Sequence, residues 1–490
     1  MGERPCGIIP APKRMDVRPG PRAWPSRFEV VCECDVAAPL RERFESDLRA
    51  GGSGEPVKLR LCEGRASAGG YVLQFQEHQV VCSASDAAGF RHGLATLMQA
   101  AAEPRLPIGS IEDAPRLAVR GIHLNFESYR RMGVEVALRL IDAAGRFKLN
   151  AILVEYGPRF PFTAHVELCD PAALSRQDVE RLRGAALERG IQIVPLQQCL
   201  AHLDYALGHA GLAHLRERPP KTGLMCPSHP ESQALFRSLA SDIMKLHPEE
   251  KWFHLGGDEA RKIGECPRCR PIVERDGVGA LYGQYVGEQA RWLLEQGRRP
   301  IVWDDTLCAH PEALDHLPKE TIIQYWDYIA VADPTPVLIP RMAHVDGAPR
   351  VVHDWRRRLG AWRKGLSDVQ IEVMKAYSTA ARLPGALGKR FMGEFGRYLG
   401  EGFPRWVRAL PYLEYYQDRG FEVITSPTGM GNGDTRDGVP KFARFDANIH
   451  THADRCIANG KALGIITTLW YNMPPEVLYQ PLIRTAQCAW

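Results

Sequence analysis

The feature that most constrains the fold is an alternation of short apolar runs with helical segments over residues 116–490. The runs are "LAVRGIHLN", "NAILVEY", "IQIVPLQ", "KWFHLGG", "PIVWDD", "TIIQYWDY", "FEVITSP" and "LGIITTLW". Each is apolar on both faces, as a strand buried in a parallel sheet must be. Eight strand–helix pairs over roughly 370 residues predict a (β/α)8 (TIM) barrel with insertions. A doubly wound open sheet is the alternative, but we find no G-x-G-x-x-G turn in the chain.

The first 115 residues have a different pattern and predict a small N-terminal α+β domain. Short alternating or apolar runs such as "RFEVVCECD" and "GYVLQFQEHQVVCSAS" indicate strands. The segments "APLRERFESDLRAG" and "DAAGFRHGLATLMQAAAE" have helical spacing. We therefore expect two domains, over residues 1–115 and 116–490, and two are also natural for a chain of 490 residues.

Composition and charge exclude several classes of function. The net charge of +4 is small for this length, and no Lys/Arg run resembles a nucleic-acid-binding arm. No stretch of eighteen apolar residues predicts a membrane span, and the first residues lack a signal-peptide core. The 13 cysteines are scattered without framework spacing, which favours reduced thiols. We expect a cytoplasmic protein that binds neither nucleic acid nor membrane.

A barrel places its chemistry at the carboxyl ends of the strands, and these ends are rich in polar and aromatic residues. The candidates are Asn125, Glu155, His202, Asp258, Glu259, Trp303, Asp305, Trp326, Tyr328 and Trp470. Asp258 and Glu259 are adjacent, although neighbouring side chains inside a strand point to opposite faces. Because Gly256 and Gly257 free the backbone just before them, both carboxylates can serve one pocket. The competing interpretation is a solvated helix N-terminus, where acidic residues favour the macrodipole.

The remaining signals at the strand ends are weaker. Tryptophans most often pack in a core, but Trp303, Trp326 and Trp470 also suit the apolar face of a sugar. His202 follows the third strand. Two interpretations are open for it: it lines the pocket, or it has a structural role. The pair Cys266 and Cys269 has the spacing of half a zinc site, but no second pair at ribbon spacing follows. We interpret the pair as free thiols or a local structural feature and expect no metal or cofactor in the chemistry.

An insertion of about residues 336–420 carries more Lys and Arg than acidic residues and has helical periodicity. We interpret it as a solvated helical cap on the barrel. A partner-binding surface, including one for a homodimer, is the alternative.

The stretch "HLGGDE" resembles the H-x-G-G-D-E pattern of glycoside hydrolase family 20, the β-N-acetylhexosaminidases. "GIIPAPKRM", "LPIGSIEDAPRLAVRG" and "FKLNAILVEY" resemble other parts of that family in the same order. "EYGPRFPF", "VPLQQCLAHLDYAL", "HPES" and "WDD" are most similar to its hexosaminidase D-like branch. The seventh strand lacks the Tyr-x-Asp pair found elsewhere in the family, and Tyr328 is a candidate replacement for that tyrosine.

The resemblance implies substrate-assisted hydrolysis of terminal β-linked N-acetylglucosamine or N-acetylgalactosamine from a glycoside or oligosaccharide. Glu259 would protonate the glycosidic oxygen and later deprotonate water, and Asp258 would hold the 2-acetamido N–H. The acetamide oxygen would attack the anomeric carbon, so that the product retains its configuration. Two alternatives stay open: a protein nucleophile at Asp304 or Asp305, and a non-catalytic glycan-binding barrel.

Overall fold

The computed structural model describes most of the chain. The described ranges are residues 7–48, 52–127, 132–328, 330–331, 393–401, 408–430, 442–470 and 475–490. Most of the predicted insertion at 336–420 lies outside them, so its interpretation as a helical cap stays a prediction.

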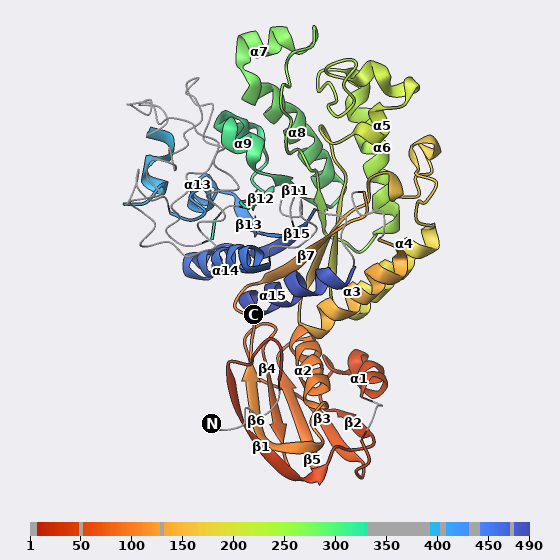
Figure 1. Ribbon diagram of the computed structural model, residues 1–490, viewed down its shortest axis with the longest axis vertical. Helices are drawn as coiled ribbons and strands as arrows, with labels where there is room; N and C mark the ends of the chain where they lie inside the picture. Colours follow the sequence, from red (N-terminus) through yellow and green to blue (C-terminus); the bar gives the residue numbers. More distant parts are fainter. Residues whose placement is uncertain are drawn as a thin grey trace.

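Residues from Val119 onward form a closed parallel barrel, which confirms the predicted fold (Figure 1). Its strands are β7 (Val119–Asn125), β8 (Ala151–Glu155), β9 (Gln192–Leu196), β10 (Trp252–His254), β11 (Arg299–Trp303), β12 (Ile322–Trp326), β13 (Glu422–Ser426) and β15 (Gly464–Leu469). Each strand pairs in parallel with its neighbours, and β15 closes the ring by pairing with both β13 and β7. A short strand, β14 (Thr428–Met430), pairs with the end of β15.

The apolar runs are buried on both faces because the barrel has two cores. Leu153, Val194, Ile301 and Ile466 belong to a cluster that fills the barrel interior. A second, larger cluster lies between the strands and the surrounding helices. These helices are α3 (Val134–Arg146), α4 (Arg176–Glu188), α6 (Pro230–Leu246), α8 (Val278–Glu295), α13 (Tyr412–Asp418), α14 (Phe442–Asn459) and α15 (Tyr479–Ala489). Three shorter helices, α5 (Asp204–Leu207), α7 (Arg270–Asp276) and α9 (Asp305–Ala309), lie in the loops after strands.

The N-terminal part is a six-stranded sheet with two helices on one face (Figure 1). Its strands are β1 (Arg14–Ala23), β2 (Phe28–Cys32), β3 (Val57–Glu63), β4 (Tyr71–Phe75), β5 (Gln79–Ala84) and β6 (Arg105–Asp113), and its helices are α1 (Arg41–Asp47) and α2 (Ala87–Ala100). The strand order is β1-β6-β4-β5-β3-β2, with only β2–β3 and β3–β5 parallel. The predicted boundary at residue 115 falls between β6 and β7 and stays a prediction.

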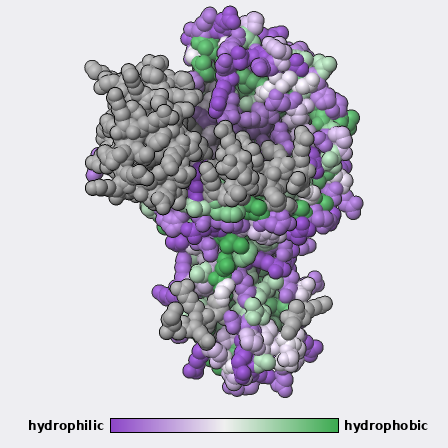
Figure 2. Space-filling model, in the orientation of Figure 1, coloured by the Kyte–Doolittle hydropathy of each residue, from purple (hydrophilic) through white to green (hydrophobic). Residues whose placement is uncertain are grey.

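Within the described part of the chain, none of the helices combines the length and apolar character that crossing a bilayer requires. Figure 2 shows a narrow waist at the junction of the two domains, and the coloured residues on this face are hydrophilic and hydrophobic in mixture.

A buried ion pair joins the two domains at this waist. The Asp113 carboxylate accepts hydrogen bonds from Lys148 Nζ at 3.0 Å, Tyr71 OH at 3.1 Å and Trp490 Nε1 at 2.6 Å. Both charged side chains are fully buried, and Lys148 Nζ also lies 4.3 Å from the centre of the Trp490 ring. Burial lowers the pKa of Lys148 to about 8, although Asp113 opposes that shift. The junction therefore depends on a carboxylate that compensates a desolvated ammonium group.

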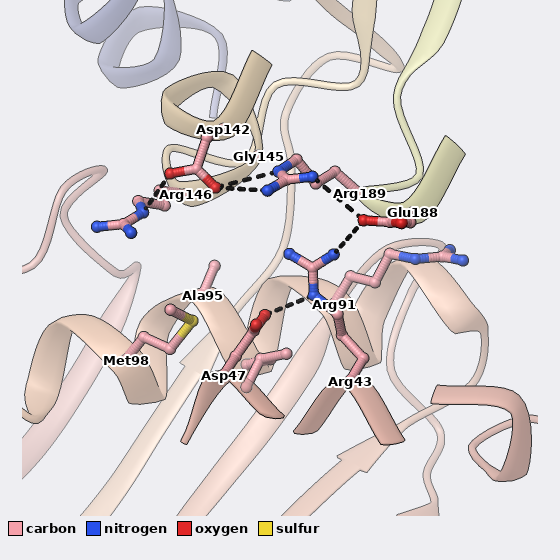
Figure 3. Close-up of a pocket in the computed structure, with 11 residues that line it drawn as sticks. Arg43, Asp47, Arg91, Ala95, Met98, Asp142, Gly145, Arg146, Glu188 and Arg189 are labelled. Atoms are coloured by element: carbon pink, nitrogen blue, oxygen red, sulfur yellow. Dashed lines mark hydrogen bonds and ion pairs between the residues drawn. The ribbon is translucent and has the colours of Figure 1, made fainter. Parts of the chain in front are cut away.

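The edge of the junction carries a different kind of contact (Figure 3). Arg43 of α1 lies 3.5 Å from Glu188 of α4, and Arg189 lies 2.7 Å from Asp142 of α3. These pairs line a pocket between the domains and are partly exposed, so each contributes little to stability.

We predict that Asp113→Ala lowers the free energy of unfolding by about 3–5 kcal/mol, because it leaves the Lys148 ammonium group buried without its carboxylate. Glu112→Ala is the matched control, since Glu112 forms an exposed ion pair with Arg14. Its loss should cost at most about 1 kcal/mol. Urea denaturation measures both values, and equal losses in the two variants would contradict this account.

Candidate active site

The segment after β10 makes a tight turn that only certain residues allow. Gly256, Gly257 and Glu259 have φ angles of 67°, 85° and 52°, in the left-handed region. A Cβ at Gly256 would lie 1.9 Å from Gln198 Oε1, and one at Gly257 would lie 2.8 Å from Tyr282 OH. The Gly-Gly pair is therefore required both by the backbone and by the side chains that surround it.

Hydrogen bonds from three directions fix this turn. The Gly256 N–H donates to His254 Nδ1 at 2.8 Å, and the Gly257 N–H donates to Gln198 Oε1 at 3.2 Å. Tyr282 OH donates to the Gly257 carbonyl at 2.8 Å. Burial lowers the pKa of His254 to about 3, so its neutral ring can accept the Gly256 hydrogen bond. Asp258 and Glu259 thus leave the strand end in defined directions.

Asp258 is a buried carboxylate with compensating partners. Its Oδ1 accepts from Gln198 Nε2 at 3.1 Å, and its Oδ2 lies 3.4 Å from His202 Nε2. Burial acts to raise the Asp258 pKa, but His202 and the Gln198 amide outweigh it and hold that pKa below its ordinary value. Asp258 is therefore ionised at neutral pH.

His202 carries the positive charge of the site. Burial acts to lower its pKa, but Asp258, with Glu155 and Glu259, raises the pKa to about 10. The imidazole is therefore protonated at neutral pH and can donate from both nitrogens. The sequence predicted this residue at the pocket, and the structure places its Nε2 between Asp258 and Glu259, 3.8 Å from Glu259 Oε2.

Glu259 occupies a more open position than Asp258. Its side chain is 37% exposed and its Oε1 accepts from Arg261 Nη2 at 2.8 Å. Because the Arg261 side chain is 73% exposed, this is a surface ion pair that costs little to break. The Glu259 N–H donates to Asp305 Oδ2 at 2.9 Å, which anchors its backbone. One carboxylate is thus buried and charged, and its neighbour is accessible to a ligand.

A chain of side chains extends from Asp258 across neighbouring strands. Gln198 Nε2 donates to both Asp258 Oδ1 and Glu155 Oε1, the latter at 3.2 Å. Asn125 Nδ2 donates to Glu155 Oε2 at 3.1 Å. The carboxyl ends of β7, β8, β9 and β10 therefore share one buried polar network, which includes Asn125, Glu155 and Asp258 from the predicted set.

The predicted aromatic residues lie at or just after the ends of β11, β12 and β15. Trp303 has no exposed surface, and its ring centre lies 4.6 Å from that of His254 and 6.0 Å from that of Trp470. Trp326 and Tyr328 stack with their ring centres 4.8 Å apart, and Trp470 Nε1 donates to Tyr328 OH at 2.6 Å. Trp303 is thus part of the packed floor, and its role as a sugar platform stays a prediction.

The two aspartates considered as nucleophiles both support backbone groups. Asp304 is fully buried, and its Oδ1 accepts from the Trp326 N–H at 3.0 Å. Tyr416 OH donates to its Oδ2 at 3.3 Å. Asp305 accepts from the Glu259 N–H, so it contacts the site through the backbone of Glu259.

The site contains three residues that were not among the predicted set. Gln198 bridges two carboxylates, and Arg261 pairs with Glu259. Glu127 lies just after β7, where burial and the neighbouring Glu155 raise its pKa to about 8. A search of the sequence that continued one or two residues beyond each predicted strand end would have found Glu127 and Gln198. Nothing in the sequence pattern indicates Arg261.

Two groups of the described residues have the spacing of metal ligands, and neither contains Asp258 or Glu259.

Two family models match this chain. "Glycosyl hydrolase family 20, domain 2" matches residues 5–114, and "Glycosyl hydrolase family 20, catalytic domain" matches residues 151–336. Together they span more than half of the chain, on both sides of the domain junction.

Curated relatives agree with the family models. The chain is 30% identical to hexosaminidase D of Bos taurus over 194 residues, which are 38% of this chain and 56% of the relative. It is 29% identical to hexosaminidase D of Homo sapiens, again over 38% of this chain and 40% of the relative. The chain thus spans about half the length of the curated relatives it matches.

Solved structures share the fold over the whole chain. A β-N-acetylhexosaminidase from Bacteroides fragilis has a TM-score of 0.66 at 16% identity, covering 99% of this chain and 90% of that one. An exo-β-N-acetylglucosaminidase from Vibrio harveyi, in complex with N-acetylglucosamine, has a TM-score of 0.64 at 17% identity, covering 99% and 73%. The family models, the curated relatives and the shared fold converge on one conclusion: the chain belongs to glycosyl hydrolase family 20.

Proposed function

We propose that this protein is a retaining exo-β-N-acetylhexosaminidase that releases terminal β-linked N-acetylglucosamine or N-acetylgalactosamine by substrate-assisted catalysis. The observation that carries the proposal is the contrast between the two adjacent carboxylates. Asp258 is buried and charge-paired, whereas Glu259 is 37% exposed and accessible to a leaving group. The names of the curated relatives, both hexosaminidase D, support the same reaction class.

In the proposed reaction, Glu259 gives its proton to the glycosidic oxygen as the bond to the anomeric carbon breaks. The acetamide oxygen of the substrate forms the new bond to that carbon from the opposite face, and an oxazolinium ion results. Water then forms a bond to the anomeric carbon as the bond from that carbon to the acetamide oxygen breaks, which restores the acetamide, and Glu259 takes up the proton that water loses. Two displacements on opposite faces retain the configuration.

Asp258 is suited to accept the acetamide N–H during this reaction. An ionised carboxylate is a pure acceptor, and its negative charge stabilises the cationic ring that forms when the oxygen attacks. The His202 cation and the Gln198 amide hold it ionised and oriented before the substrate arrives. This preorganisation means that little rearrangement is needed when charge develops.

The contacts of Asp304 and Asp305 support the substrate's acetamide as the nucleophile. Asp304 is fully buried against Tyr416 and the Trp326 backbone. Asp305 holds the Glu259 N–H, so an attack by Asp305 would release the general acid from its position. A protein nucleophile is therefore the weaker account of this site.

Tyr328 is our candidate for the residue that assists Asp258 at the acetamide. Its ring stacks on Trp326, and its hydroxyl accepts a hydrogen bond from Trp470 Nε1. We expect Trp326 and Trp470 to contact the sugar, since aromatic faces suit its apolar surface.

The reaction class is tested by comparing two chromogenic substrates. A nitrophenyl N-acetyl-β-glucosaminide should be hydrolysed, and the matched nitrophenyl β-glucoside, which lacks the acetamide, should not. Similar turnover of both would indicate a protein nucleophile, and no turnover of either would indicate a glycan-binding barrel.

We predict that Glu259→Gln folds normally and loses about 10²-fold or more in kcat/KM on substrates with poor leaving groups. Activated aryl glycosides need less protonation and should lose less. Steady-state kinetics on an aryl glycoside and on a disaccharide measure the difference. A uniform loss on both substrates would remove Glu259 from the role of general acid.

Asp258→Asn should reduce turnover of N-acetylglucosaminides and N-acetylgalactosaminides about a thousandfold, or roughly 4 kcal/mol. The amide keeps the size of the side chain but loses the charge that stabilises the cationic intermediate. The thiazoline analogue of that intermediate should bind the wild type tightly and the variant poorly. If the variant bound the thiazoline as tightly as the wild type, Asp258 would have no part in the mechanism.

The pH profile tests the role of His202. Its positive charge lowers the Asp258 pKa, so His202→Gln should raise that pKa. Activity that requires the Asp258 carboxylate should then be lost at a higher pH on acidification than in the wild type. His78→Gln, an exposed change in the N-terminal domain, is the control and should leave the profile unchanged. An identical acidic limb in all three proteins would contradict the proposed coupling.

A further inference from the structure

A cluster of buried sulfur and carboxylate groups lies in two loops beside the catalytic pair. Cys226 and Glu217 belong to the loop between β9 and α6, and Cys266 and Cys269 belong to the loop between β10 and α7. Glu217, Cys226 and Cys269 are buried, and Cys266 is 9% exposed. One ligand atom from each of the four lies within 4.8 Å of the others. The half-site seen in the sequence is thus completed by two residues that lie 40 and 49 positions before Cys266.

The distances match the edges of a tetrahedron around one metal ion. Cys226 Sγ lies 3.5 Å from both Cys266 Sγ and Cys269 Sγ, and Cys269 Sγ lies 3.2 Å from Glu217 Oε2. Tetrahedral zinc with Zn–S bonds of about 2.3 Å and Zn–O bonds of about 2.1 Å sets S···S near ~3.8 Å and S···O near ~3.6 Å. Each measured edge therefore needs only a few tenths of an ångström of expansion.

The surroundings of the cluster orient its ligand atoms. The Cys269 N–H donates to Cys266 Sγ at 3.3 Å, and Ser228 Oγ lies 3.2 Å from Cys269 Sγ. The Gly264 N–H donates to Glu217 Oε1 at 2.8 Å, and the Cys266 N–H donates to the same oxygen at 3.0 Å. This leaves Glu217 Oε2 directed at the sulfur atoms. Such donors are what a metal-bound thiolate and carboxylate require around them.

From this geometry we propose that Cys226, Cys266, Cys269 and Glu217 bind one structural zinc ion. Three thiolates and a carboxylate on tetrahedral edges fit zinc, which prefers sulfur, nitrogen and carboxylate ligands in that geometry. All four positions are filled by protein atoms, as in structural sites, so the ion takes no part in the chemistry. The three thiols release their protons to solvent as the zinc binds.

The site would connect the two loops that carry the catalytic residues. Cys266 follows Glu259 by seven positions, through a turn with left-handed Lys262 and Gly264. On the other side, the Met225 N–H donates to the Leu200 carbonyl at 2.9 Å, just before His202. Zinc at Cys226 and Cys266 therefore fixes the loop of His202 relative to the loop of Asp258 and Glu259.

Metal analysis of the purified full-length wild type gives the first test. Protein expressed with zinc in the medium and passed through a desalting column should hold about one zinc per chain. Cobalt substituted for zinc should give the intense near-ultraviolet sulfur-to-metal charge-transfer band and the visible bands of tetrahedral thiolate ligation. Wild-type protein with no zinc and no such bands, or with a disulfide within the cluster, would overturn the proposal.

Variants locate the ion. Cys226→Ser and Cys266→Ser should lose at least about nine-tenths of the zinc, because three ligands bind far more weakly than four. Cys169→Ser lies outside the cluster and should keep it. His214→Gln is a second control, since His214, His229 and Glu231 form an exposed group with ligand spacing nearby. Zinc lost in His214→Gln but kept in Cys226→Ser would contradict the assignment.

A further variant covers the case in which the cysteine variants do not fold. Glu217→Gln keeps an oxygen acceptor for the Gly264 N–H and leaves all three sulfur atoms. Its cobalt form should keep the charge-transfer band, shift the visible bands, and release the metal to a chelator faster than the wild type. Identical cobalt spectra and release rates in the two proteins would remove Glu217 from the ligand set. Zinc content is measured without substrate, so it stands or falls separately from the proposed hydrolysis.

Discussion

The arrangement of the site depends on the electrostatic cost of burying Asp258. A carboxylate taken out of water either becomes neutral or must find compensating partners. Here the partners are the His202 cation and the Gln198 amide, both from the segment after β9. The turn through Gly256 and Gly257 allows the Asp258 carboxylate to reach these two partners. Its neighbour Glu259 is not buried as a result. One local constraint thus sets the backbone, the protonation states and the exposure of the pair.

Parallel strands of a closed barrel make this compensation possible. Their carboxyl ends meet on one rim, so residues distant in the sequence contribute to a single network, from Asn125 through Glu155 and Gln198 to Asp258. For the same reason, most of the barrel and the polar rim could be predicted from strand periodicity and strand ends. The adjacency of Asp258 and Glu259 after two glycines already indicated a shared site, because no regular strand would direct both side chains to one pocket.

Other features could not be predicted, since they depend on contacts that have no sequence period. Trp303 and Trp326 are the last residues of neighbouring strands, yet only Trp303 of these two is fully buried, against His254 and Trp470. Asp304 and Asp305 are identical in type and adjacent, but one supports Trp326 and the other supports Glu259. The contact of Cys226 with the Cys266 and Cys269 pair could not be predicted either, because it forms only once the loop of Cys226 has folded.

The proposed zinc site also stabilises two long loops at the carboxyl end of the barrel. The loops after β9 and β10 extend far beyond the barrel core and contain only short helices, α5 and α7. Apolar residues of these loops, such as Leu203, Leu207 and Ile263, are buried in the core around the barrel. Catalysis needs more than this packing, because His202, Asp258 and Glu259 must be held within a fraction of an ångström. A four-coordinate ion links the two loops directly, in addition to this packing. Because the ion lies only a few residues from Glu259, it stabilises the loops close to the catalytic side chains, whose positions matter most. It also leaves the pocket free for the sugar.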